Sequence, residues 1–223
     1  ILYRKLDCLV CETPDARAYF NPKIRKKAVV IGNPIKSNLP EWVGQDSNIL
    51  LNYCRLEKQK NLPMLIKAFE IVKKNHPEAL LEIYGEGTEE EYLRNLIKDN
   101  NLDSCVKLNA FSSQIHQIAA NAYAFVSCSD YEGISNSMLE SMAIGMPVIC
   151  TDCPIGGARM VIQDGINGIL VPVGDYKKMA KRINEILDNK NKAVEIATRA
   201  KELRYKYSIE KVVEMWEKCV EIL

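Results

Sequence analysis

Short runs of β-branched and apolar residues alternate with amphipathic helical patterns along most of the chain. The apolar runs predict strands at 6–11, 28–32, 48–53, 79–84, 105–109, 123–127, 147–151 and 168–171. Helical spacing of apolar positions predicts helices at 62–74, 89–99, 113–121, 136–144, 157–163, 175–188, 191–204 and 208–222. Strands that alternate with helices are typical of a parallel sheet joined by crossover helices. The pattern therefore predicts an α/β fold whose last part, beyond residue 175, is purely helical.

Composition and charge add few constraints. Of the 223 residues, 47% are hydrophobic and 26% are charged, which are the proportions of an ordinary soluble globular protein. A net charge of +1 gives no overall field that would attract nucleic acid, so we expect no nucleic-acid partner. No apolar run approaches the roughly 20 residues of a membrane span, and the start lacks the pattern of a signal peptide. We therefore expect a cytoplasmic location.

The two histidines, His76 and His116, fall on polar helical positions, where we expect them to be solvated.

Eight cysteines raise the question of disulfides or a metal site. Most lie inside apolar, strand-like runs, where free thiols behave as small hydrophobic side chains. Cys8 and Cys11 are three residues apart on one predicted strand, so their side chains should point to opposite faces. Cys150 and Cys153 have no histidine or further cysteine pair at the spacing of a zinc knuckle. We expect reduced cysteines and no bound metal.

A basic segment follows the predicted strand at 48–53. Arg55, Lys58 and Lys60 lie directly before the helix that begins near residue 62. Cations at a helix N-terminus oppose the positive end of the helix dipole, so this placement is unfavourable unless an anion joins them. Phosphate would suit the position because free backbone N–H groups and basic side chains would converge on it. The alternative is a solvated basic loop.

A second segment, at 130–140, also connects a strand end to a helix N-terminus. Gly133 would let the backbone approach a ligand, and the helix that follows offers another set of N–H donors. Two positive helix ends together predict a diphosphate site. Glu132 and Glu140 would repel phosphate, but carboxylates hydrogen-bond hydroxyl groups well, which points to the sugar portions of a nucleotide-linked sugar. Glu140 could instead close a capping box with Ser137, and Glu132 could be an ordinary loop charge.

Four motifs follow one another along the chain. They are Arg55-Leu56-x3-Lys60-Asn61, Glu132-x7-Glu140, Ser141-Met142-Ala143-x-Gly145-x-Pro147-Val148-Ile149 and Asp164-Gly165-x-Asn167-Gly168-x-Leu170-Val171-Pro172. Each is weak by itself, but in this order they resemble the C-terminal, donor-binding half of a retaining family-4 glycosyltransferase (glycosyl transferases group 1) of the GT-B fold. The resemblance extends from residue 28 to the end of the chain. It implies a Rossmann-like parallel sheet with helices on both faces.

The resemblance also implies roles for individual residues. Arg55 and Lys60 would hold the diphosphate of a nucleotide-sugar and stabilise its negative charge as the glycosidic bond breaks, with neither a metal nor a cofactor. Glu132 would lie near the sugar ring and complete the catalytic group. The donor would also meet a wider set of positions at loops and strand ends: the backbone of Lys107 and Leu108 beside the base, Gly85 and Gly87 in the turn that shapes the pocket, the N–H groups of Gly133, Ile134 and Ser135 near the sugar, and Glu140 on the ribose.

The same resemblance divides the chain into three parts. Residues 1–33 resemble the tail of an N-terminal acceptor domain with its linker, 34–205 the nucleotide-sugar-binding domain, and 206–223 a C-terminal crossover helix. Most of the acceptor domain is then missing, so we expect this chain to bind a donor but to transfer sugar poorly or not at all alone. Where many members carry glutamate after a Gly-Gly turn, this chain has Ala158 followed by Arg159, which is either an extra cation or a surface residue.

The implied function is transfer of a hexose-type sugar, with retention, from a nucleotide-diphospho-sugar to a cell-surface polysaccharide or glycolipid. UDP is favoured as the commonest donor class. The acceptor, lipid-linked or polysaccharide, would be reached through the missing domain, and the intact protein would contact the inner face of the cell membrane peripherally.

Two alternative functions stay open. A non-catalytic nucleotide-binding module would use the same residues. An NAD-dependent oxidoreductase shares the sheet pattern, but Glu90 stands at the third glycine position of its G-x-G-x-x-G fingerprint.

Overall fold

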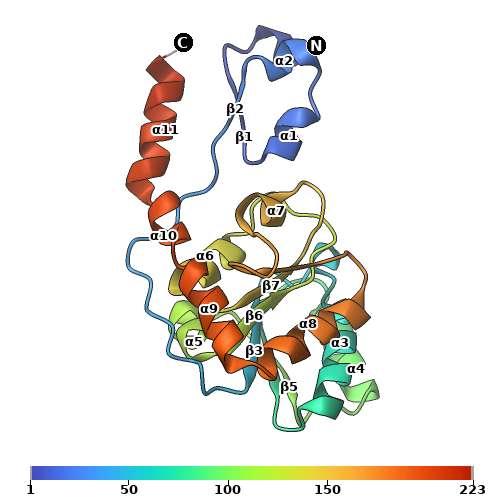
Figure 1. Ribbon diagram of the computed structural model, residues 1–223. Coiled ribbons are helices and arrows are strands. Elements are labelled where there is room, and N and C mark those ends of the chain that lie inside the picture. The colour runs from blue at the N-terminus through green and yellow to red at the C-terminus, as the bar shows by residue number, and fades with distance from the viewer. Residues whose placement is uncertain (1, 222–223) are drawn as a thin grey trace.

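The larger part of the structure is built on a six-stranded parallel sheet. The computed structural model describes residues 2–221, and the strand order of this sheet is β5-β4-β3-β6-β7-β8 (Figure 1). Its strands are β3 (Ile49–Tyr53), β4 (Leu80–Tyr84), β5 (Val106–Asn109), β6 (Ala124–Ser127), β7 (Val148–Thr151) and β8 (Ile169–Val171). Every pairing between them is parallel. The predicted parallel α/β fold is confirmed, and each of these strands begins one residue later than the sequence pattern predicts.

Helices cover both faces of this sheet. Neighbouring strand residues alternate between two cores: Leu50 packs with the helices on one face and Leu51 with those on the other, as the period of two along a strand requires. The core on the first face is shared by α3 (Leu62–Asn75), α4 (Glu90–Asp99) and α8 (Tyr176–Leu187). The core on the second face is shared by α5 (Ile115–Asn121), α6 (Asn136–Ile144), α7 (Gly157–Val161) and α10 (Leu203–Lys206), while α9 (Lys190–Ala200) reaches both. The Rossmann-like layering implied by the resemblance is therefore present.

A smaller unit contains both ends of the described chain. In it, β1 (Leu9–Cys11) pairs in parallel with β2 (Ala28–Val30), and η1 (Leu2–Lys5), α1 (Pro14–Ala18) and α2 (Pro22–Arg25) are short helices around this pair. The last helix, α11 (Ile209–Glu221), lies beside the two strands, away from the larger sheet (Figure 1). The predicted strand at 6–11 is shorter than expected. Its pairing starts only at Leu9, whose N–H donates to the Lys27 carbonyl.

Two connections join the smaller unit to the larger one. The first follows β2 and the second precedes α11, and they run side by side because the Ile35 N–H donates to the Tyr207 carbonyl over 2.7 Å. The first connection has no regular structure and is fastened by Trp42, whose indole N–H donates to the Ala122 carbonyl over 2.8 Å. Arg204 fastens it a second time through an ion pair with Glu41. The assignment of roles to residues 1–33, 34–205 and 206–223 stays a prediction.

Two features of the described residues bear on membranes and metals. Between residues 2 and 221, no helix has both the length and the apolar character that a membrane span requires. Within the same range, His, Cys, Asp and Glu side chains do not gather in groups of three or more that could hold a metal ion. All eight cysteine thiols are free.

We predict that mild oxidation will link α11 to the first strand. The Sγ atoms of Cys8 and Cys219 lie 3.0 Å apart, so a small movement would bring them to the disulfide length of about 2.05 Å. Oxidised glutathione would accept two electrons and two protons from this pair and leave as two molecules of reduced glutathione. Mapping of peptides by mass spectrometry should then find Cys8 joined to Cys219. The Cys219→Ser variant is the control, and oxidation that joins other cysteines instead would contradict the position of α11.

Candidate functional site

The candidate site lies where the loops after β3 and β6 meet at the carboxyl edge of the sheet. These strands are direct neighbours, so the loops that follow them lie side by side. The Gln59 carbonyl accepts from the Asp130 N–H over 2.9 Å, and the Gln59 side chain donates to the Tyr131 carbonyl over 2.7 Å. Asn61 donates to the Asp130 carboxylate over 2.7 Å. The two segments that the sequence singles out separately therefore form one hydrogen-bonded surface.

An ion pair between Lys60 and Glu132 lies at the centre of this surface. The Lys60 ammonium is 2.7 Å from Glu132 Oε2, and the two side chains are only 12% and 20% exposed. Glu132 is thus a half-buried, ion-paired loop residue, and its role toward a donor stays a prediction. An anion that binds Lys60 must compete with this carboxylate.

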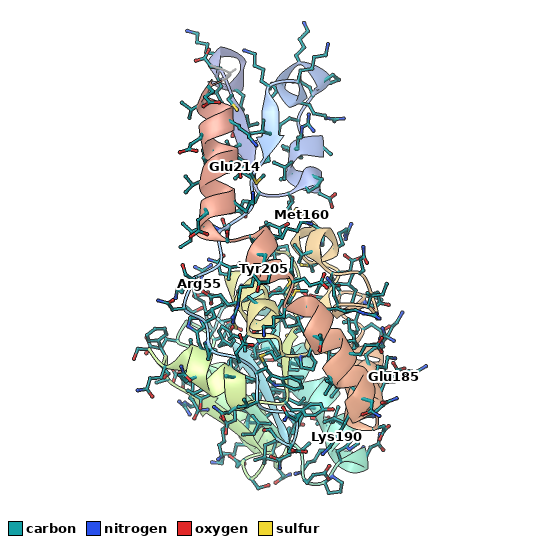
Figure 2. All side chains as sticks on the ribbon, turned by 60° about the vertical axis from the view of Figure 1, so that its left-hand side comes forward. Arg55, Met160, Glu185, Lys190, Tyr205 and Glu214 are labelled. Carbon is teal, nitrogen blue, oxygen red and sulfur yellow. The ribbon has the colours of Figure 1, made fainter. Side chains whose placement is uncertain are left out.

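Arg55 supplies a second cation beside the pair. Its side chain is exposed at the end of the larger unit that faces the smaller one (Figure 2). It makes no ion pair with any residue between 2 and 221. Cys54 precedes it, and burial raises the pKa of this thiol to about 12, so the thiol is protonated at neutral pH and leaves the local charge to Arg55 and Lys60.

Glycines in the turn after β4 hold the Arg55 loop in place. A Cβ added to Gly85 would collide with the Cys54 carbonyl, and one added to Gly87 would collide with the Leu56 backbone. This close approach allows the Leu56 N–H to donate to the Glu86 carbonyl over 2.8 Å. Gly85 lines the cavity beside Arg55, but the reason that this position needs glycine is its close contact with the Arg55 loop. Sequence reasoning missed this because the contact joins two different strand ends.

A cavity of about 400 Å³ opens beside Arg55. Its lining comes from the ends of β3 and β4 and from the segment between β5 and α5: Tyr53, Cys54, Arg55, Tyr84, Gly85, Glu86, Phe111, Ser112 and Ile115. Phe111 is 70% exposed there and offers a flat apolar face. Lys107 and Leu108, expected beside a nucleobase, lie on β5 and are not among the lining residues. The sequence analysis did not single out Phe111; the signal that could have identified it is an aromatic residue just beyond the end of a predicted strand.

Glu140 lies in the middle of α6, where two basic side chains approach its carboxylate. His116 Nε2 is 2.9 Å from Glu140 Oε2, and Lys36 Nζ is 3.7 Å from Oε1. The N-terminus of α6 is capped by Ser135, whose hydroxyl accepts from the Met138 N–H. The alternative of a capping box between Ser137 and Glu140 is therefore wrong, because the helix begins two residues earlier than that box requires. The expectation of a solvated His116 is also wrong.

The start of α6 is fixed to the sheet by Tyr53. Its hydroxyl donates to the Ser137 carbonyl over 2.8 Å and contacts the Ser141 hydroxyl at 2.9 Å. Burial raises the pKa of Tyr53 well above its ordinary value, and the Glu140 carboxylate nearby adds to this effect. Tyr53 also lines the cavity; Glu140 itself is not a lining residue, but Ser141, which directly follows it, contacts the Tyr53 hydroxyl.

The loop at 133–135 meets a carboxylate from the smaller unit. The Ile134 N–H donates to Glu12 Oε2 over 3.3 Å, and Gly133 leaves no room for a Cβ against the same carboxylate. An N–H group that the resemblance assigns to the donor thus already faces an anion. Nearby, Arg159 pairs with Asp152 at 2.6 Å and with Asp15 at 3.4 Å, and its side chain is 45% exposed, so it is an ion-paired surface residue.

His76, the other histidine, is also half-buried rather than solvated. It lies 3.5 Å from Glu78 and 3.4 Å from Asp188, at the far end of α3 from the site. The expectation of solvation is wrong here for the same reason as at His116. Single-sequence patterns do not reveal which carboxylates from other elements will lie beside a polar helical position.

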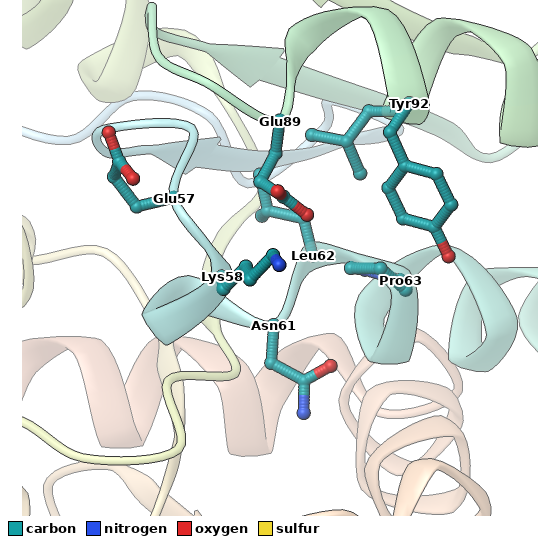
Figure 3. A pocket seen from close by; sticks show the side chains of 8 residues that line it. Glu57, Lys58, Asn61, Leu62, Pro63, Glu89 and Tyr92 are labelled. Atoms are coloured by element: carbon teal, nitrogen blue, oxygen red, sulfur yellow. The ribbon is translucent and has the colours of Figure 1, made fainter.

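A second cavity, of about 520 Å³, lies between the start of α3 and the start of α4 (Figure 3). Glu57, Lys58, Asn61, Leu62, Pro63, Glu89, Tyr92 and Leu93 line it. Lys58 therefore does not join Arg55 and Lys60, as the basic cluster in the sequence suggested. The 3-10 turn η2 (Lys58–Lys60) directs these neighbouring lysines to different environments.

These features define a Rossmann-like α/β protein with Arg55 and Lys60 at the carboxyl edge of its sheet. Residues 40–203 match the family model described as Glycosyl transferases group 1. The chain therefore belongs to this family.

Individual relatives are similar over most of this chain. It is 30% identical to the poly(glycerol-phosphate) alpha-glucosyltransferase of Bacillus subtilis over 162 residues. The aligned region covers 73% of this chain and 24% of the relative. It is 31% identical to the poly(ribitol-phosphate) alpha-N-acetylglucosaminyltransferase of Staphylococcus aureus over 173 residues. This region covers 77% of this chain and 35% of the relative. The crystal structure of an S. aureus TarM mutant in complex with fondaparinux, alpha-GlcNAc-glycerol and UDP superposes with a TM-score of 0.88 at 27% identity, which covers 97% of this chain and 44% of that one. The chain thus spans about a quarter to a third of the two curated relatives.

We predict that Gly85→Ala destabilises the protein by about 2–4 kcal/mol, because overpacking against the Cys54 carbonyl adds to an unfavourable backbone conformation. Urea unfolding should show this loss. Gly174→Ala is the control: it also lies at positive φ, but nothing within 4 Å meets its added Cβ, so it should cost about 1 kcal/mol. Equal losses in the two variants would contradict the close contact between the turn and the Arg55 loop.

Proposed function

We propose that this chain is the donor-binding half of a retaining GT-B enzyme that transfers a hexose-type sugar from a UDP-sugar to a cell-surface polysaccharide or glycolipid. The observation that carries the proposal is the joining of the 55–61 and 130–135 loops into one surface. It presents Arg55 and Lys60 at the start of α3, beside the start of α6. A diphosphate is the anion that suits two cations and two helix N-termini.

In this proposal the diphosphate is the leaving group. As the bond between the sugar and the distal phosphate oxygen breaks, negative charge grows on the diphosphate, and Arg55 and Lys60 stabilise it from fixed positions. No metal ion is needed for this charge stabilisation. The ion pair with Glu132 positions Lys60 before the donor binds. When Lys60 moves to the phosphate, the Glu132 carboxylate becomes available to the sugar ring. The N–H groups of Gly133, Ile134 and Ser135 would bind the donor once Glu12 moves aside.

The nucleoside would occupy the cavity beside Arg55. Phe111 would contact the base, with the ends of β3 and β4 around it, and Glu140, directly before the Ser141 that contacts Tyr53, would accept from the ribose hydroxyls. The TarM structure in complex with UDP, at 27% identity, supports uracil as the base.

The acceptor would be bound mainly by chain outside these 223 residues. The relatives named as poly(glycerol-phosphate) and poly(ribitol-phosphate) transferases are much longer than this chain, and their names support a cell-surface polymer as acceptor. We propose that the unit around β1 and β2 is the tail of an acceptor domain and that α11 crosses back onto it. The chain alone would bind the donor and transfer little sugar, while the whole protein would act at the inner face of the cell membrane.

We predict that the chain binds UDP in the presence of EDTA and that Arg55→Ala with Lys60→Ala weakens this binding at least tenfold. Each charged hydrogen bond contributes roughly 1.5–3 kcal/mol, and a factor of ten corresponds to about 1.4 kcal/mol. Titration calorimetry with UDP, GDP and ADP would measure the affinities. Lys58→Ala is the matched control, because it removes the same charge from the same loop but faces the second cavity. Failure of all three nucleotides to bind, or an equal loss in the Lys58→Ala variant, would contradict the proposed site.

We predict that Glu132→Gln strengthens UDP binding by this chain about two- to fivefold. Without the carboxylate, phosphate no longer competes with Glu132 for Lys60. An ion pair of this kind contributes roughly 0.5–1 kcal/mol. The same variant in the whole enzyme should transfer sugar more slowly, because the group near the sugar ring has changed. Calorimetry and a sugar-transfer assay would measure the two effects; weaker UDP binding would show that Glu132 does not compete for Lys60.

A further inference from the structure

We propose that His116 is a positioning residue that orients the Glu140 carboxylate toward the ribose hydroxyls of the bound nucleotide. The assignment rests on the proposed function, in which Glu140 accepts from those hydroxyls. His116 Nε2 lies 2.9 Å from Glu140 Oε2, a distance typical of a charge-assisted hydrogen bond. Because a carboxylate only accepts, the proton of this bond lies on Nε2.

The pair is built on two packed helices and is sheltered from solvent. His116 lies in the first turn of α5 and Glu140 in the middle of α6, and both helices contribute to the core on the same face of the sheet. The side chains of His116 and Glu140 are 17% and 15% exposed. Lys36 is the other cation near this carboxylate, but it lies 3.7 Å away and is 68% exposed. Of the two, His116 is therefore the stronger constraint on the orientation of Glu140.

The position of the pair connects it to the nucleotide cavity. Ile115, directly before His116, lines the cavity. Tyr53 also lines it, and its hydroxyl contacts the Ser137 carbonyl and the Ser141 hydroxyl, which flank Glu140 on α6. A carboxylate has about four lone-pair directions, so a bond to His116 at Oε2 leaves acceptor capacity for both hydroxyls of a ribose. A free glutamate side chain would have to be ordered when the nucleotide binds, whereas this one is ordered in advance. Affinity for the ribose should thus depend on His116 although His116 itself does not touch the nucleotide.

The test compares a nucleotide that has both ribose hydroxyls with one that lacks them. Titration calorimetry of this chain with UDP and with 2′,3′-dideoxyuridine diphosphate would be carried out on the unaltered protein and on His116→Ala. We expect His116→Ala to weaken UDP binding about tenfold and to leave binding of the dideoxy analogue unchanged. His116→Gln, whose amide N–H can take the place of Nε2–H, should restore most of the affinity for UDP. In a Glu140→Ala background, His116→Ala should have no further effect.

His76→Ala is the control, since His76 is also half-buried beside carboxylates but lies away from the cavity; it should leave both affinities unchanged. Equal weakening of UDP and of the dideoxy analogue by His116→Ala would mean that the pair only fastens α5 to α6, and it would overturn the assignment. UDP binding unaffected by His116→Ala would overturn it as well. If the unaltered chain binds neither UDP nor GDP nor ADP, the donor site itself is contradicted, and this assignment falls with it.

Discussion

The parallel pairing of β3 with β6 is the constraint on which the candidate site depends. Because these strands are adjacent and point the same way, the loops that leave them share one edge of the sheet. Hydrogen bonds from Gln59 and Asn61 then join the loops, and Lys60 meets Glu132 between them. The ion pair with Glu132 stabilises Lys60 at the N-terminus of α3, where the helix dipole would otherwise repel a cation. The candidate site is therefore charged and ordered before any ligand binds.

Backbone contact, rather than side-chain packing, fixes the position of Arg55. The turn after β4 touches the loop after β3 so closely that Gly85 and Gly87 cannot carry a side chain. The cost is the larger loss of conformational freedom that glycine suffers on folding. The gain is a loop whose Cys54 and Leu56 N–H groups are paired with the β4 turn and whose arginine lines the cavity. In the proposed function, this arrangement favours catalysis, because the loop that carries Arg55 need not reorganise as charge develops on the leaving group.

The sequence predicted the fold well because its signals are local. Period-two and period-3.6 patterns placed the strands and most helices of the larger unit within a residue or two, and Pro63 marked the start of α3. The single helix predicted at 191–204 is wrong, because the structure divides it into α9, which ends at Ala200, and α10, which begins at Leu203. The candidate residues at 55–60 and 132–140 were also found from the sequence, since cations and glycines stand out where strands turn into helices. Prediction was poorest where partners come from distant elements, as for the strand at 6–11, the cap of α6 and the two histidines.

By itself the sequence determined the α/β class, the order of strands and helices along the chain, and which charged residues lie at strand ends. These depend on patterns within about twenty residues. Only the tertiary structure decided that Lys60 pairs with Glu132, that Lys58 belongs to a different cavity, that Ser135 rather than Ser137 caps α6, and that His116 holds Glu140. Each of these joins residues from separate elements, and the packing of the sheet and its helices decides which of them meet.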